Sequence, residues 1–169
     1  QVKKGNLVGM RKSFPEYIVV RLDDDLKFIA DADLITGKTV SAIRRCFEEY
    51  RPVMSISKGT LVHHDLADHN FMHVKDRITG IFDWENAVVG DPILDLASAP
   101  TWTTHFPREE KLLEGFRSVK ALPEHFGEKL QMYRLRTMIW KMVFALRAGI
   151  LNEKRRQRFF DALSPFGIS

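Results

Sequence analysis

The sequence predicts an α+β domain that is mainly α-helical, with a small β-hairpin near its middle. The chain has 169 residues, 44% of them hydrophobic and 28% charged, which suffices for one domain with a buried core. Its second half carries apolar residues at helical spacing, and residues 71–84 read as two strand-like segments around a turn. We therefore expect residues 1–169 to form a single domain.

The first part of the chain allows more than one interpretation. Residues 17–22 (YIVVRL) have the composition of a strand, and Asp23–Asp25 would suit a turn. Residues 26–35 are compatible with a strand or a helix, so the structure of residues 1–36 stays open. A helix is predicted between Gly37 and Pro52, where these apolar residues recur at helical spacing: Val40, Ile43, Phe47 and Tyr50.

The middle of the chain predicts strands and a polar loop. Residues 60–65 (TLVHHD) read as a short buried strand that runs into the loop. Residues 71–74 and 79–84 then form the two strands of a hairpin, joined by residues 75–78. Asp91 and Pro92 predict the start of a helix, as its N-cap and first helical residue.

The remainder is expected to be almost entirely helical. Residues 128–148 carry an apolar stripe broad enough for a core helix, ended by Gly149. The stripe consists of Leu135, Met138, Ile139, Met142, Val143 and Leu146. A last helix is expected from Asn152 to about Leu163, and its basic run at residues 154–158 is interpreted as a solvated face.

Composition excludes several classes of protein. The only cysteine, Cys46, excludes an internal disulfide framework and favours a reducing cytoplasm. No apolar run is long enough for a transmembrane helix, and no secretory pattern is present, so we expect no membrane as partner. Because the basic residues are scattered along the chain, we expect no nucleic acid as partner either. The chain starts at Gln1 without an initiator methionine, which favours a fragment of a longer protein.

Residues 61–97 concentrate polar side chains, and three interpretations compete for them. The first is a polar loop without a chemical role. The second is a metal site built from His63, His64, His69 and His73, or a metal-dependent phosphohydrolase that uses a His-Asp pair. This is weak, because the surroundings read as loop and strand, where a spacing of four residues does not bring histidines together.

The third interpretation is an oxygen-ligand site for Mg²⁺ and phosphate. Asp65 and Asn70 lie on one loop, and the predicted hairpin returns Asp83 close to them. Carboxylate and amide oxygens are the ligands that Mg²⁺ prefers. Phosphoryl transfer needs one carboxylate to receive the proton of the attacking hydroxyl, and an amide with a second carboxylate to hold metal against the phosphates.

These motifs resemble those of a known family. His63-x-Asp65-x-x-x-x-Asn70, then "IFDWE" with Asp83, then "GDPILDLA" from Gly90, resemble the aminoglycoside phosphotransferase and choline kinase-like family. The resemblance implies the C-terminal lobe of a protein-kinase-like fold, whose small β-hairpin carries the metal-binding Asp83. It also implies ATP as phosphate donor and Mg²⁺ as cofactor.

The resemblance assigns a role to each matching residue. Asp65 matches the catalytic base, while Asn70 and Asp83 match the metal ligands. His63 matches a structural histidine that braces the catalytic loop against the backbone near Asp83. Asp91 and Asp95 match acids that support the same loop. If Asp95 is buried, it must find a hydrogen-bond partner.

The catalytic loop departs from the usual His-Gly-Asp-x-His-Pro-x-Asn pattern of the family. His64, Ala67 and Asp68 stand at the Gly, His and Pro positions. Asp68 adds a negative charge near the metal site or the acceptor, although a solvated loop acid is the simpler interpretation.

The acceptor is less clearly indicated than the chemistry. In this family the helices after the "GDP" segment line the acceptor pocket, so these aromatic residues are candidate wall residues: Trp102, His105, Phe106 and Trp140. We name Asp68, Trp102 and His105 as candidate substrate-binding residues. The net charge of +4 argues slightly against a polycationic substrate.

A kinase-like enzyme also needs an N-terminal lobe with a glycine-rich loop and a lysine for the phosphates, and neither is present in this sequence. We therefore predict a small-molecule hydroxyl kinase, for an aminoglycoside-type antibiotic or a related amino alcohol or sugar, represented by one lobe. The alternatives are a non-catalytic kinase-like binding module and the phosphohydrolase described above.

Overall fold

The structure of the protein is a computed structural model, which describes residues 2–3, 6–7, 11–101 and 108–168. These residues are mainly helical and form three small sheets, so the predicted α+β class is confirmed. The helices are α1 (Phe14–Ile18), α2 (Leu22–Asp31), α3 (Gly37–Glu49), α4 (Ile93–Ser98), α5 (Glu109–Val119), α6 (Phe126–Arg147) and α7 (Glu153–Leu163). The strands are β1 (Val2–Lys3), β2 (Asn6–Leu7), β3 (Thr60–Val62), β4 (Phe71–Val74), β5 (Arg77–Ile81) and β6 (Val88–Gly90).

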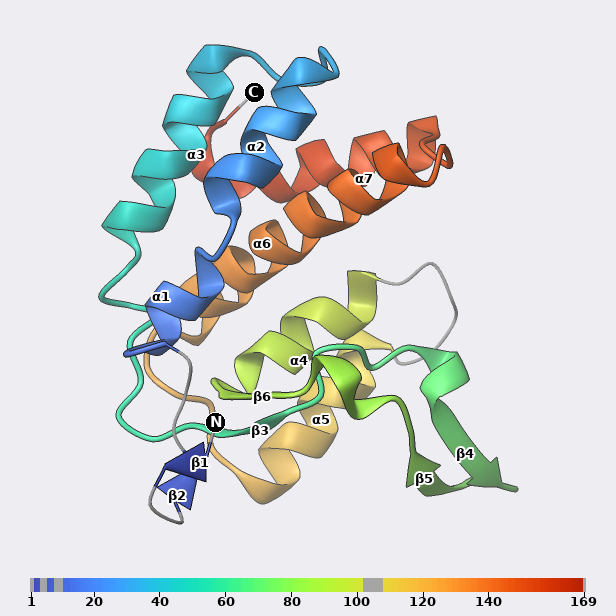
Figure 1. Ribbon diagram of the computed structural model, residues 1–169. Helices are drawn as coiled ribbons and strands as arrows, with labels where there is room; N and C mark the ends of the chain where they lie inside the picture. Colours follow the sequence, from blue (N-terminus) through green and yellow to red (C-terminus); the bar gives the residue numbers. More distant parts are fainter. Residues whose placement is uncertain (1, 4–5, 8–10, 102–107, 169) are drawn as a thin grey trace.

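Helix α6 is the centre of the molecule. It packs against α2, α4 and α7, with α2, α3 and α7 on one side and α4, α5 and the strands on the other (Figure 1). Its buried residues therefore point in several directions and include Met132, Leu135 and Ile139. None of the described helices is long and apolar enough to cross a membrane.

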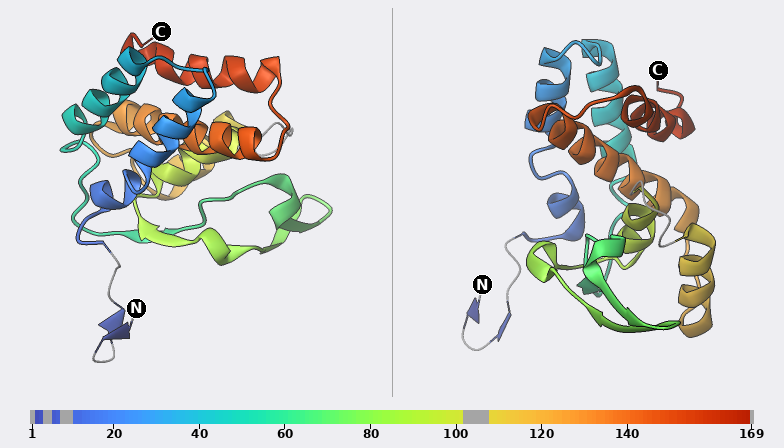
Figure 2. Two further views of the ribbon diagram at one scale, coloured as in Figure 1. Left: turned by 45° about the horizontal axis from the view of Figure 1, so that its top comes forward. Right: turned by 90° about the vertical axis from the view of Figure 1, so that its right-hand side faces the viewer.

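The strands pair in three separate antiparallel ribbons, β1–β2, β3–β6 and β4–β5. The β4–β5 hairpin projects from the body at one end, and β1–β2 lies apart from the rest in each view (Figures 1 and 2). The sequence does not predict β1, β2 or β6. Pairing of β3 with β6 brings the start of the predicted catalytic loop next to Gly90 and Asp91, because Thr60 lies opposite Gly90.

Residues 17–22, which the sequence left open and whose composition suits a strand, do not form one. The chain forms α1 and then turns into α2, because Ser13 accepts a hydrogen bond from the Glu16 backbone N–H and Phe14 and Ile18 are buried. The carbonyls of Ile18 and Val20, which a strand would pair with a neighbour, instead accept hydrogen bonds from the Arg136 guanidinium, each at 2.8 Å.

Asp23–Asp25, which by composition would suit a turn, do not form one either. These acids occupy the first turn of α2, where the exposed N–H groups of a helix favour negative charge. Among the element boundaries that differ from those predicted, two lie next to the site. Strand β5 ends at Ile81, so Asp83 follows the strand instead of ending it. Helix α4 begins at Ile93, one residue later than expected, although the Asp91 carboxylate still accepts a hydrogen bond from the Ile93 N–H at 3.1 Å.

Candidate active site

His63 connects the loop after β3 to the end of the β4–β5 hairpin. Its Nδ1 accepts a hydrogen bond from the Asp65 backbone N–H at 3.3 Å, so Nε2 carries the proton and donates to the Phe82 carbonyl at 2.6 Å. The ring is buried and lies 4.5 Å from the Trp84 ring. Because both ring nitrogens are engaged with the backbone, His63 is unsuited to bind a metal ion in this arrangement.

Asp95 holds the same loop from the opposite side. Its two carboxylate oxygens accept hydrogen bonds from the backbone N–H groups of His63, at 2.9 Å, and His64, at 2.7 Å. Burial raises the pKa of Asp95, and these backbone donors act against that rise by favouring the carboxylate form. The Asp95 carboxylate therefore has the hydrogen-bond partners that a buried carboxylate needs.

His64 adopts a left-handed backbone conformation, with φ of 67°. Glycine adopts this conformation at little cost, which explains physically why glycine suits this position of the loop. The His64 side chain lies against Tyr17, with Nδ1 3.3 Å from the tyrosine hydroxyl. Burial and then Arg136 lower the pKa of His64, against the effect of Asp65.

Asp65 and Asn70 are held together within the loop. The Asn70 side-chain amide, which is buried, donates to the Asp65 carbonyl at 2.9 Å and lies 3.4 Å from its Oδ2. Among the described residues, no group donates to Asp65 Oδ1, although this oxygen is buried. Asp65 therefore presents a carboxylate oxygen that is shielded from water and ready to accept a hydrogen bond from a ligand.

Asp83 lies beside Asn70 because the hairpin closes there. The Phe82 backbone N–H donates to the Asn70 carbonyl at 2.8 Å, and Asp83 is the next residue. Asp83 has a left-handed backbone, with φ of 59°, and is exposed. The sequence-predicted residues Asp65, Asn70 and Asp83 thus lie on adjoining segments of one site.

The donor set at this site fits Mg²⁺ better than a transition metal. Because the Asn70 amide nitrogen is used within the loop, its oxygen is left as the available ligand, and the exposed Asp83 carboxylate supplies another. Mg²⁺ binds through one or two such oxygens and keeps several waters or phosphate oxygens. In the described ranges, no three His, Cys, Asp or Glu side chains are grouped closely enough to hold a metal ion.

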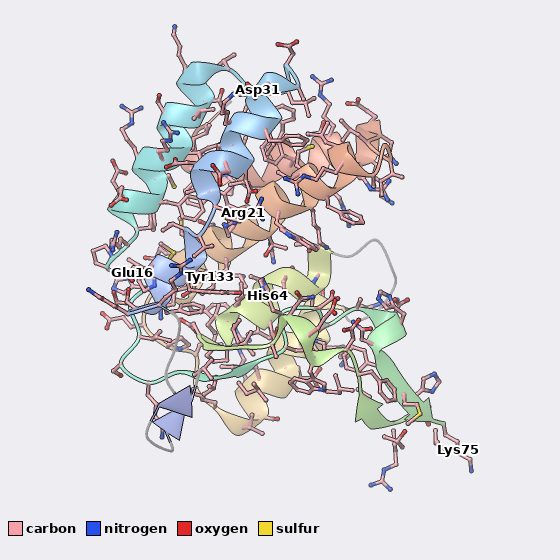
Figure 3. All side chains as sticks on the ribbon, viewed as in Figure 1. Glu16, Arg21, Asp31, His64, Lys75 and Tyr133 are labelled. Atoms are coloured by element: carbon pink, nitrogen blue, oxygen red, sulfur yellow. The ribbon has the colours of Figure 1, made fainter. Side chains whose placement is uncertain are left out.

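A pocket of about 350 Å³ opens next to Asp65. Its walls come from α1, the turn before α2, α4 and one face of α6, which contributes residues from Arg136 to Arg147. Arg21 and His64 face this region from opposite sides, one next to α2 and one in the loop below (Figure 3). The pocket is therefore positioned to hold a molecule whose reacting group meets Asp65.

Asp91 is part of a buried cluster behind the site. Its Oδ2 accepts hydrogen bonds from Lys129, at 2.7 Å, and from the Tyr133 hydroxyl, at 3.1 Å, both on α6. The Lys129–Asp91 ion pair is almost fully buried. This cluster attaches the start of α4, and with it Asp95, to the central helix.

The candidate acceptor residues fall into three groups. Asp68 is exposed and bonds locally to the His69 N–H at 2.9 Å, outside the pocket lining. Trp140 lines the pocket and is 47% exposed. Trp102, His105 and Phe106 lie outside the residues that the structure describes.

Sequence reasoning missed several pocket residues, above all Tyr17, Arg136 and Lys141. Arg136 and Lys141 could have been found from the predicted helix, since charged residues that interrupt an otherwise apolar core helix need a buried partner or a ligand. Nothing in the local sequence marks Tyr17.

A family model matches residues 19–122, more than half of the chain, and it describes the phosphotransferase enzyme family. The chain belongs to this family. The match includes the predicted catalytic loop, the hairpin and the segment after Gly90, which are the segments on which the sequence resemblance rests. Among curated proteins, no sequence matches the chain significantly.

Solved structures of aminoglycoside phosphotransferases share the fold of this family member. A thermostable mutant of APH(4)-Ia, in a ternary complex with AMP-PNP and hygromycin B, has 21% identity and a TM-score of 0.65, covering 94% of this chain and 54% of its own. The gentamicin complex of APH(2")-IIa has 18% identity and a TM-score of 0.56, covering 96% and 52%. The chain therefore spans about half the length of these structures, and its kinase-like fold is confirmed.

Proposed function

We propose that this phosphotransferase-family chain transfers the γ-phosphate of ATP, with Mg²⁺, to a hydroxyl group of a small molecule. The observation that carries the proposal is the buried Asp65 Oδ1, which accepts no hydrogen bond from the described residues and adjoins the pocket. A hydroxyl bound in the pocket would donate to this oxygen and lose its proton to Asp65 as it attacks phosphorus.

In this proposal Asn70 and Asp83 hold the metal, and the remaining polar residues position the loop. When bound, Mg²⁺ would neutralise the phosphate charge and bridge the phosphate oxygens. His63 and Asp95 fix the backbone on either side of Asp65 through the bonds described above. Asp91 anchors α4 to α6 and so positions Asp95.

We also propose that a second, nucleotide-binding lobe completes the active site, and that these 169 residues alone transfer phosphate poorly. Two observations support this. The solved structures that share the fold are about twice as long. The hairpin next to Asn70 and Asp83 exposes Met72, Val74, Ile78 and Phe82, which are 46–62% accessible. A surface of this kind is typical of a face that another part of a protein covers.

The single cysteine, Cys46, is a free thiol and fits a cytoplasmic protein.

The test uses the complete enzyme, which includes the second lobe, and substitutes Asp65. Asp65→Asn keeps the shape of the side chain but removes the proton acceptor, so turnover should fall by about 10²–10⁴-fold while ATP binding stays nearly unchanged. Asp83→Ala should instead weaken Mg·ATP binding. Phosphate transfer is measured by ADP release, and nucleotide affinity by calorimetry.

The matched control is Asp76→Asn in the exposed turn of the hairpin, which should leave both quantities unchanged. Near-normal turnover by Asp65→Asn would show that Asp65 is not the base. Tight ATP binding without turnover by the unsubstituted enzyme, across aminoglycosides, amino alcohols, sugars and hydroxy acids, would instead favour the non-catalytic binding module.

A further inference from the structure

Arg136, which lines the pocket beside Asp65, has a guanidinium nitrogen that makes no hydrogen bond within the described residues. An arginine side chain has five N–H donors. Nε donates to the Ile18 carbonyl and Nη2 to the Val20 carbonyl, each at 2.8 Å, and Nη2 also donates to Asp25 Oδ2 at 2.9 Å. These three bonds use the one hydrogen of Nε and both hydrogens of Nη2, so the two hydrogens of Nη1 are left.

Nη1 of Arg136 is buried as well as unpartnered. The ion pair with Asp25 is nearly buried on both sides, and the three hydrogen bonds hold the planar group in one orientation. Nη1 therefore cannot turn toward another partner unless these bonds break. A buried donor without a hydrogen bond costs free energy, so folded proteins supply it with a protein group, an ordered water or a ligand.

The hydroxyl groups of two other pocket residues are directed elsewhere. The Tyr17 hydroxyl lies 3.3 Å from His64 Nδ1. The Thr137 hydroxyl donates to the Tyr133 carbonyl at 2.8 Å. Within the described part of the chain, the pocket thus presents the donor Nη1 without its acceptor, and a bound molecule can supply one.

Asp65 presents the opposite kind of unpartnered atom to the same pocket, because its buried Oδ1 is an acceptor that no described group donates to. Both residues act on the ring of His64. Burial lowers the pKa of His64 most, Arg136 lowers it further and Asp65 raises it. Since electrostatic effects weaken with distance, both charged groups lie within reach of this one ring. A single molecule in the pocket can therefore donate to Asp65 and accept from Arg136.

The two atoms set different requirements for a ligand. Asp65 Oδ1 needs a donor, which the reacting hydroxyl supplies. Arg136 has donors only, so its partner must be an acceptor such as an oxygen, whereas an ammonium group has no lone pair to offer. Because Asp25 already balances the charge of Arg136, a neutral hydroxyl or ether oxygen is sufficient.

We propose that Arg136 is a binding residue for the acceptor, and that its Nη1 donates to a second oxygen of the molecule whose reacting hydroxyl lies at Asp65. The acceptor is then a compound with at least two oxygen groups, a polyol or a sugar. This inference rests on the proposed function, because Asp65 defines where the reacting hydroxyl binds. It excludes the ammonium group of an amino alcohol from the position next to Nη1.

The test uses matched probes that share a cyclohexane ring and one alcohol and differ in a second substituent. These are cyclohexanol, the 1,2-, 1,3- and 1,4-cyclohexanediols, and the aminocyclohexanols of the same spacings, which are cations at neutral pH. Each is titrated into the chain with ¹⁵N-labelled arginine, and NMR follows the Arg136 Nη1 signals. We expect at least one diol to shift these signals and to bind about tenfold more tightly than cyclohexanol and the matching aminocyclohexanol.

Two outcomes of this titration would overturn the proposal. If no diol moves the Arg136 signals, Nη1 holds an internal water only. If the diols and the aminocyclohexanols bind with equal affinity, the pocket does not require an oxygen at this position.

Arg136→Lys locates the second contact. Lysine keeps the positive charge beside Asp25 but has one nitrogen in place of three, so the preference for the diol should be lost while cyclohexanol binding stays unchanged. The control is Arg134→Lys on the same helix, whose guanidinium pairs with Glu109 outside this pocket, and it should keep the preference. A folded Arg136→Lys variant that still prefers the diol would overturn the proposal. If this variant does not fold, the titration of the unsubstituted chain decides by itself.

This test separates the present proposal from the proposed function, because binding needs neither nucleotide nor turnover. If the complete enzyme transfers phosphate to the aminocyclohexanols in preference to the diols, the role of Arg136 is wrong while the phosphotransferase function stands. If Asp65→Asn retains full turnover, the proposed function fails even where a diol binds at Arg136.

Discussion

Lys141 is a partly buried cation in the wall of the pocket beside Asp65. Burial, followed by the neighbouring Arg158, lowers its pKa to about 7, against the attraction of Asp65. In the unfolded chain the amine keeps its proton up to its ordinary pKa of 10.5. Between these values the unfolded chain binds more protons than the folded one, so raising the pH favours the folded state.

The Lys141→Met variant tests this difference. The free energy of unfolding of the unsubstituted chain should rise by roughly 1–2 kcal/mol between pH 7 and 9 relative to the variant, since partial exposure screens the full effect. Urea denaturation followed by circular dichroism at several pH values measures it. Parallel pH profiles for the two proteins would show that Lys141 titrates normally.

At the scale of elements, α1 and β6 depend on each other. A Cβ atom at Gly90, the last residue of β6, would lie against the ring of Phe14 and approach its Cδ2 to 2.9 Å. Phe14 is buried and cannot withdraw easily, because its ring lies 5.8 Å from Tyr17 and 5.7 Å from Tyr133, between centroids. Glycine at this position therefore allows α1 to pack where the chain enters α4.

Gly90→Ala should lower the free energy of unfolding by about 1–3 kcal/mol, the usual cost of adding a methyl group to a packed region. The matched control is Gly127→Ala in the first turn of α6, where a Cβ meets nothing within 4 Å. This change should be neutral or stabilising by about 0.5–1 kcal/mol, because alanine is the better helix residue. Urea denaturation compares the two, and equal effects would contradict the packing argument.

At the scale of the whole molecule, the apolar side chains on the β4–β5 hairpin are not used by the core. Val74 and Ile78 are 62% and 53% exposed, and the hairpin projects from the helical body (Figure 2). Burying such side chains stabilises an assembly by about 25 cal/mol per Å² of apolar surface. A covering lobe would recover this free energy.

The chain should therefore bind an apolar fluorescent dye such as ANS at this surface. Replacing Val74 and Ile78 with Lys should reduce dye fluorescence severalfold without lowering the free energy of unfolding, because neither side chain belongs to the core. Val119→Lys is the control, since Val119 is 85% exposed at the end of α5, away from the hairpin. In the complete enzyme, dye binding should be absent before any substitution, and strong binding there would show that the hairpin remains uncovered.

Much of the fold and the site follows from local sequence. The helices α3, α6 and α7 show their apolar spacing and end signals directly, as with Asn152, whose side chain accepts a hydrogen bond from the Arg155 N–H at 3.0 Å. The hairpin is predicted because its turn and strands are adjacent in the chain. The spacing of Asp65, Asn70 and Asp83 is likewise local, since one loop and one hairpin suffice to bring them together.

Long-range contacts decided the rest. Residues 17–22 have the composition of a strand, yet they form the end of α1 and the turn into α2. The carbonyls of Ile18 and Val20 there accept hydrogen bonds from Arg136, which is 118 residues from Ile18 in the chain. The basic character of the pocket arises in the same way, since Arg21 and the basic residues of α6 meet only after α2 packs on α6. The sequence by itself determined the family and marked the polar loop from His63 to Asn70, because those signals lie within short segments. Only the tertiary structure decided which charges face Asp65, because that depends on how distant helices pack.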